Sequence, residues 1–271
     1  VHGTTPKVIG GSDRALVLPV QRDTGVEHRV VVTVRVDSVK PRARWTVYVD
    51  AATGEPVVRR QELRFAEGTV RYRVSPRYPT AGFENLPATF AQHTVNGAPA
   101  TSNGAGVLLW TGVASATVIP SLTGTFARVV NAAGPVATTS LALAPNGTAL
   151  WDLSTDEFGD AQLSGYIHAN IAKEYAKTLD PDLPWLAQAI PVFVNEDEIC
   201  NAYSELDDIH FFRAGGDREI FCENSARIAD IVYHEFGHSL HGQTFGFDID
   251  DALSEGISDY YGATITNDPA T

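Results

Sequence analysis

Residues 225–241, with the sequence SARIADIVYHEFGHSLH, decide how the C-terminal part of the chain folds. Their apolar residues recur at spacings of three and four, which predicts an amphipathic helix. These apolar residues are Ile228, Ile231, Val232 and Phe236. Within this helix His234 and His238 are four residues apart, so both imidazoles lie on one face, one turn apart. The segment therefore fits the pattern H-E-x-x-H, in which Glu235 lies beside the same face.

Two imidazoles in this arrangement can bind one metal ion. Zinc accepts histidine nitrogens at roughly 2.0–2.1 Å, and the intervening Glu235 can take a proton from a water molecule that zinc activates. The alternative is that His234 and His238 are two partly buried histidines on an ordinary amphipathic helix.

A catalytic zinc needs a third protein ligand and one open position. Glu255 is the candidate, seventeen residues after His238, on a third helix that we expect from an N-cap at Asp250 through Tyr261. Asp259 is one turn further along, where it can accept a hydrogen bond from a ligand histidine and fix its tautomer. The alternative for both acids is a solvated acidic helix face.

The residue composition of the chain changes twice before this region. Residues 28–36 and 45–50 are rich in β-branched residues and predict strands. Residues 67–148 contain short strand-like runs separated by Gly, Pro, Asn and Ser, which predicts an antiparallel β-sandwich that acts as a structural or interaction module. Residues 149–271 add a helix over 160–177 and a buried strand over 190–194, which indicates an α+β unit.

Composition narrows the class of protein. The 271 residues include 44% apolar and 20% charged residues, which is ordinary for globular proteins, and no apolar run is long enough for a membrane helix. With 33 acidic against 20 basic residues, the net charge of -13 argues against nucleic acid as a partner. It favours solubility and cation binding, and the simplest alternative is just a soluble protein.

Two further features indicate a secreted protein. The sequence contains no methionine, so we expect a processed product, either after removal of a secretory signal or after trimming. Cys200 and Cys222 are the only cysteines, and in an oxidising compartment they could form a disulfide. The alternative is two free, buried thiols.

Three segments resemble the thermolysin-like and fungalysin-like zinc endopeptidases, the gluzincin type of metalloprotease. They are HEFGH at 234–238, SEGISDYYG at 254–262 and Asn201-Ala202-Tyr203 upstream. The resemblance implies a hydrolase that cleaves peptide bonds with one zinc held by His234, His238 and Glu255. It also implies that Asn201 and Ala202 bind the peptide substrate at a sheet edge, whereas the alternative is a turn at a strand start.

The segment WTVYVDAATGEPV at 45–57 is similar to the end of the propeptide module of these enzymes. The resemblance implies that residues 1–66 are a retained α+β pro-region, a partner of the catalytic part in a zymogen. The fold class we expect is therefore multidomain, with this module at 1–66, the β-sandwich at 67–148 and a thermolysin-like α+β catalytic subdomain at 149–271.

The sequence also departs from the family. The family continues with a helical subdomain that supplies a histidine for the transition state, and the sequence through Thr271 does not contain it. We therefore expect a precursor or a processed fragment, in which the missing segment was cleaved off or sits in a separate chain and is a further partner. Calcium sites are common in the family, and the candidate ligands here are Asp230, Asp248, Asp250, Asp251 and Asp268. The alternative functions are an aminopeptidase of the same metal type and a non-catalytic zinc-binding or adhesion module.

Overall fold

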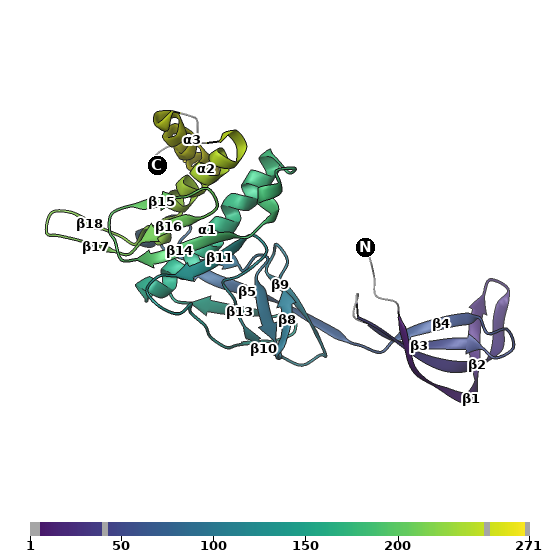
Figure 1. Cartoon of the computed structure of the whole chain (residues 1–271). Helices are drawn as coiled ribbons and strands as arrows, with labels where there is room; N and C mark the ends of the chain where they lie inside the picture. The colour runs from purple at the N-terminus through teal and green to yellow at the C-terminus, as the bar shows by residue number, and fades with distance from the viewer. Residues whose placement is uncertain (1–5, 40–42, 247–249, 269–271) are drawn as a thin grey trace. The chain divides into compact units, whose positions relative to one another are not determined.

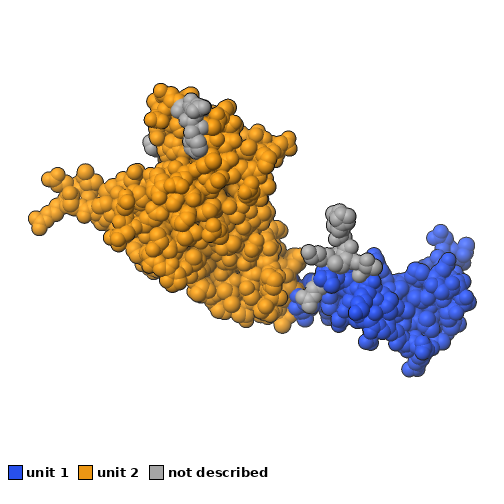
Figure 2. Space-filling model, viewed as in Figure 1, with its two compact units in different colours: residues 1–66, 111–113 blue, residues 67–110, 114–271 orange. Residues whose placement is uncertain are grey.

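The computed structural model describes residues 6–39, 43–246 and 250–268, which form a mixed α+β protein. The chain divides into two compact units (Figures 1 and 2). The first comprises Val1–Ala66 with Thr111–Val113, and the second comprises Glu67–Trp110 with Ala114–Thr271. No helix in the described ranges is both long and apolar enough to cross a membrane.

The first unit is an antiparallel sheet with the strand order β1-β2-β3-β4. These strands are Lys7–Arg22, Gly25–Ser38, Ala43–Asp50 and Pro56–Gln61. The expected strands at 28–36 and 45–50 are thereby confirmed. The described residues of this unit contain strands and no helix, although an α+β module was expected. The reason is that the segment before residue 28 pairs with β2 along almost its whole length, from Lys7↔Asp37 to Arg22↔Gly25.

The second unit begins with short strands arranged in several small sheets. One sheet has the order β12-β10-β7-β8, and another has the order β13-β5-β6 with β9 beside β5. Their bounds are β5 Phe65–Val74, β6 Glu84–Pro87, β7 Gln92–Val95, β8 Ala98–Thr101, β9 Val107–Thr111, β10 Ala116–Ile119, β12 Leu141–Leu143 and β13 Thr148–Asp152. Most neighbours are antiparallel as expected, but β13 pairs with β5 in parallel.

A third sheet joins the two segments that the sequence suggested as separate modules. Its order is β11-β14-β16-β15, with β11 at Ala127–Asn131, β14 at Ile190–Glu196, β15 at Ala202–Ser204 and β16 at Ile209–Phe212. Strands β11 and β14 are parallel, and the intervening chain, which includes helix α1 (Glu157–Leu179), makes the crossover that a parallel pair requires. Residues 67–148 and 149–271 therefore share one compact unit, while their division into modules stays a prediction.

Helix α1 is the centre of this unit. It contacts strands β11 and β14 as well as helix α2 (Ala229–Phe245), which itself packs against helix α3 (Asp251–Thr266). The sequence predicted one apolar face for α1, but every residue from Gly159 to Asn170 is buried. Three short 3-10 turns, at Pro79–Ala81, Pro184–Ala187 and Ser225–Arg227, and a two-stranded hairpin of β17 (Gly215–Gly216) and β18 (Phe221–Cys222) complete the unit.

A fully buried histidine joins α1 to its neighbours. The Nε2 atom of His168 lies 2.9 Å from the Ser75 carbonyl oxygen, which can only accept, so Nε2 donates this hydrogen bond. The Nδ1 atom must then accept from the Tyr233 hydroxyl at 2.8 Å. His168 thus links Ser75, which follows β5, and Tyr233, which precedes His234, to helix α1.

Acid should weaken this junction. Burial lowers the pKa of His168 from 6.5 to about 4, so its contribution to stability is present above pH 6.5 and is lost as the pH falls toward 4. Because one pKa unit is worth about 1.4 kcal/mol, we expect this histidine to remove about 2 kcal/mol from the free energy of unfolding between pH 7 and pH 5.

Urea denaturation of the wild type and the His168→Gln variant at both pH values measures this contribution. His93 is also buried, and burial lowers its pKa to about 4, so the variant should keep part of the pH dependence. An identical pH dependence in the two proteins would contradict the assignment.

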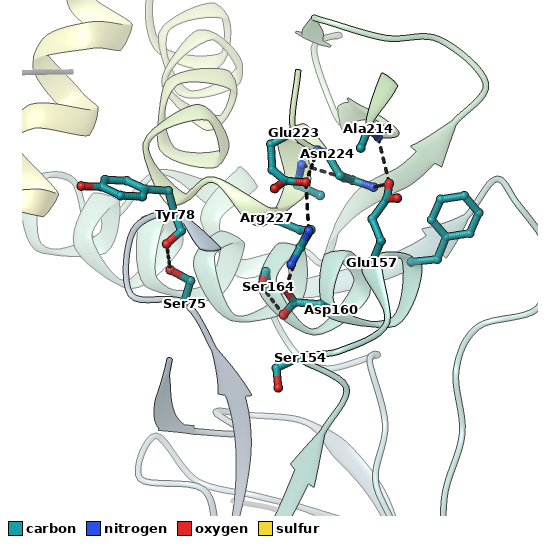
Figure 3. Close-up of polar contacts among 12 residues, drawn as sticks. Ser75, Tyr78, Ser154, Glu157, Asp160, Ser164, Ala214, Glu223, Asn224 and Arg227 are labelled. Atoms are coloured by element: carbon teal, nitrogen blue, oxygen red, sulfur yellow. Dashed lines mark hydrogen bonds and ion pairs between the residues drawn. The ribbon is translucent and has the colours of Figure 1, made fainter. Parts of the chain in front are cut away.

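A polar network holds the segment before α2 on α1 (Figure 3). The guanidinium of Arg227 contacts Asp160 at 2.7 Å and Glu223 at 2.9 Å. Glu157 accepts hydrogen bonds from the Ala214 amide at 2.9 Å and from Asn224 Nδ2 at 3.2 Å. Burial raises the pKa of Asp160 although the neighbouring guanidinium opposes this, so the ion pair is needed to keep that carboxylate charged.

Candidate metal centre

Helices α2 and α3 approach each other closely at Gly237. A Cβ atom at this position would lie 2.9 Å from the Ser258 Cα atom, closer than real Cβ contacts, so the helix spacing requires glycine here. This spacing brings Glu255 and Asp259 of α3 to the face of α2 that carries His234 and His238.

The three expected ligands converge on one point. The Nε2 atoms of His234 and His238 are 3.0 Å apart, and they lie 3.1 and 3.5 Å from the two carboxylate oxygens of Glu255. Among the described residues this is the group of three side chains that could hold a metal ion, with all ligand atoms within 4.8 Å of one another. Tetrahedral zinc ligands at 2.0–2.1 Å from the ion lie roughly 3.3 Å apart, so the donor set fits zinc.

The other nitrogen of each histidine faces an oxygen. Asp259 Oδ1 lies 2.8 Å from His234 Nδ1, where the sequence placed it. Ser254 Oγ lies 2.9 Å from His238 Nδ1. Burial, and secondarily the charge of His234, lowers the pKa of His238, which favours the neutral form that binds metals. Both Nε2 atoms are thus left to face Glu255.

Two residues of this arrangement were not predicted from the sequence. Ser254 Oγ also lies 3.1 Å from His241 Nδ1, so one hydroxyl bridges two histidines. His241 is 6% exposed, and its Nε2 atom has no hydrogen-bond partner among the described residues. The available signals were the position of Ser254 directly before the third ligand and that of His241 one turn after His238.

Glu235 lies beside the three ligands and is 7% exposed. Burial, and secondarily the negative charge of Glu255, raises the pKa of Glu235 to about 7. A carboxylate with a pKa near neutrality is well matched to accept and return a proton at that pH.

Two cavities open beside the centre, with volumes of about 510 and 470 Å³. Both are lined by Asn201, Ala202, His234 and Glu235, so they meet at the candidate centre. The first, here called the polar cavity, is also lined by Tyr203, Ser204, His238, His241, Asp251, Ser254 and Glu255. The second, here called the apolar cavity, is also lined by Ile228, Ile231, the two cysteines, Glu223, Ser225, Asp230 and Asp259.

The strand at the cavities is an edge strand. β15 pairs with β16 on one side only, through Ala202↔Phe211 in antiparallel register. Cys200, two residues before Ala202, forms the expected disulfide with Cys222. Asn201 and Ala202 therefore lie where the sequence analysis expected a sheet edge, fastened to hairpin β17–β18.

The calcium candidates have separate environments. Asp230 and Asp268 both form ion pairs with Arg77, and the side chain of Asp250 caps α3 through the Ala252 amide at 3.0 Å. Asp251 lines the polar cavity, and Asp248 lies outside the described residues. Within the described ranges they do not form a group of metal ligands, and calcium stays a prediction.

Chemically, the centre combines a site for a Lewis acid, a buried base and an open cleft beside a sheet edge. Such a combination can activate water against an extended substrate. When the chain is compared with known proteins, no family model and no curated protein matches it.

Proposed function

We propose that this chain is the catalytic part of a secreted, zinc-dependent endopeptidase with a thermolysin-like catalytic subdomain. The observation that carries the proposal is the convergence of two histidine Nε2 atoms and the Glu255 carboxylate beside the buried Glu235, at the junction of two cavities. The Cys200–Cys222 disulfide supports an extracellular location. Residues 1–66 as a pro-region and calcium as a second ion belong to the same proposal.

When bound, zinc would polarise the scissile carbonyl and make water a better nucleophile. Glu235 accepts the proton of the attacking water and returns it to the leaving amine, for which its raised pKa is suited. The free edge of β15 aligns an extended peptide by main-chain hydrogen bonds, and Asn201 adds a side-chain amide. Asp259 and Ser254 hold the rings of His234 and His238 in the orientation that leaves Nε2 toward the metal.

Metal analysis combined with casein cleavage tests this function. The purified chain should contain about one zinc, lose activity with a chelator and regain it with added zinc. Peptides with free and blocked N-termini separate an endopeptidase, which cleaves both, from an aminopeptidase. Full zinc occupancy without any cleavage would favour a non-catalytic binding module instead.

The Asp259→Asn variant should bind zinc more weakly. Removing a carboxylate that orients a ligand histidine typically costs 10- to 100-fold in metal affinity. Competition against a chromophoric chelator measures the dissociation constant. Asp182→Asn, an exposed position outside both cavities, is the matched control and should bind zinc like the wild type. Equal affinities in the two variants would exclude the orienting role.

A further inference from the structure

The cleft lies in a strongly acidic part of the chain. Residues 196–266 contain sixteen aspartates and glutamates, three arginines and no lysine. Two of the three arginines already have acidic partners, since Arg227 contacts Asp160 and Glu223 and Arg213 contacts Asp197. Six carboxylates and, among the described residues, no arginine or lysine line the two cavities, so we expect a negative potential there that one divalent ion offsets only in part.

Apart from Glu235, which belongs to the candidate centre, the acidic residues of the apolar cavity are already paired. Asp230 contacts Arg77 at 2.7 Å, Glu223 contacts Arg227 at 2.9 Å, and Asp259 contacts His234 at 2.8 Å. None of these carboxylates is left as the main partner for a ligand. The further walls of this cavity are apolar at Ile228, Ile231 and the disulfide.

The polar cavity differs from the apolar cavity because one of its carboxylates has no partner. Apart from Glu235 and Glu255, which belong to the candidate centre, its remaining acid is Asp251. Asp251 is exposed at the first residue of α3, and no ion pair or hydrogen bond of its side chain is found within the described residues. An unpaired carboxylate in a cavity wall can bind a cation without first breaking a contact.

A second observation indicates that a ligand reaches this cavity. His241 lines the polar cavity and is 6% exposed, and its Nε2 atom is buried without a hydrogen-bond partner among the described residues. A buried polar atom without a partner is costly, and a ligand that enters the polar cavity would supply one. The negative potential, the unpaired Asp251 and the unpartnered Nε2 atom of His241 thus converge on the polar cavity.

We infer that the polar cavity binds a lysine or arginine side chain of the substrate, with Asp251 as its ion-pair partner. The substrate class is then a peptide with a cationic residue on one side of the scissile bond and an apolar residue, held near Ile228 and Ile231, on the other. This inference rests on the proposed function, because it names the substrate of the same site.

The test uses the full chain loaded with zinc and peptides blocked at both ends. The peptides share one apolar residue and carry Lys, Arg, Gln or Glu at a second position, and mass spectrometry locates the cleaved bond. We expect kcat/KM to be about fivefold higher for Lys and Arg than for Gln, the gain that a good exposed ion pair gives. The preference should disappear in Asp251→Asn and persist in Asp182→Asn, which changes the net charge equally.

Binding separates this inference from the proposed function. Fluorescence anisotropy of the Lys and Gln peptides with the Glu235→Gln variant, with and without Asp251→Asn, needs no cleavage. A Lys preference that depends on Asp251 supports the inference even if no peptide is cleaved, in which case the endopeptidase proposal fails instead. Cleavage of all four peptides at equal rates overturns the inference and leaves the endopeptidase. Cleavage restricted to peptides with a free α-amine also overturns it, because Asp251 would then bind the chain end.

Discussion

Glu235→Gln is expected to abolish peptide hydrolysis while the zinc content stays at about one per chain. Glutamine keeps the shape of the side chain but cannot take the proton of the attacking water. General-base catalysis contributes typically 10²- to 10⁴-fold, so we expect kcat to fall by about 10³-fold. Zinc should remain because the three ligand side chains are untouched. Cleavage kinetics and metal analysis on the same samples measure both parts.

Glu84→Gln is the matched control, since Glu84 is exposed on β6 and lines neither cavity. It should retain wild-type activity and zinc. If Glu235→Gln kept more than about a tenth of the activity, another group would be the base. If it lost zinc, Glu235 would be a ligand, and the three-ligand assignment would be wrong.

Replacing Arg227 with leucine is expected to lower the free energy of unfolding by about 3–5 kcal/mol. The Asp160 side chain is completely buried, and the nearest cation is the guanidinium of Arg227 at 2.7 Å. Removing one partner leaves a buried charge uncompensated, which costs more than the pair itself contributes. Urea denaturation at pH 7 gives the change.

Two variants make this prediction specific. Arg213→Leu breaks an ion pair with Asp197 whose side chains are 46% and 83% exposed, so its loss should stay below about 1 kcal/mol. Adding Asp160→Asn to Arg227→Leu removes the carboxylate charge that has lost its partner, and it should restore part of the lost stability. A single-variant loss as small as that of Arg213→Leu would mean that solvent reaches Asp160.

Local patterns predicted the elements around the centre well. The spacing of apolar residues predicted the helix that contains His234 and His238, and the N-cap at Asp250 predicted the start of α3. The strand pairings were not predictable in this way. The parallel pairs β11–β14 and β13–β5 join segments more than fifty residues apart, and no local pattern records which strands meet. The burial of every residue from Gly159 to Asn170 of α1 follows from these same long-range contacts.

The residues of the candidate site also differ in whether a local sequence pattern could predict them. Spacing on two helices predicted that Glu255 and Asp259 lie near His234 and His238, because residues one turn apart share a helix face. Ser254 and His241 left none, because their contact depends on how α2 and α3 lie against each other. Asp251 was a candidate for calcium in the sequence, and only its place in the polar cavity suggests a different ligand.

Gly237 lines neither cavity, yet it sets the distance between the two helices that carry the proposed metal ligands. In this chain the second variable position of H-E-x-x-H therefore cannot accept a side chain without a shift of the helices. Any larger residue there would widen the gap at Ser258 and carry Glu255 away from the histidines. Positions 237 and 258 should consequently covary in related sequences. A related sequence could then retain His234, His238 and Glu255 and still lose the proposed metal site through one added methyl group at position 237.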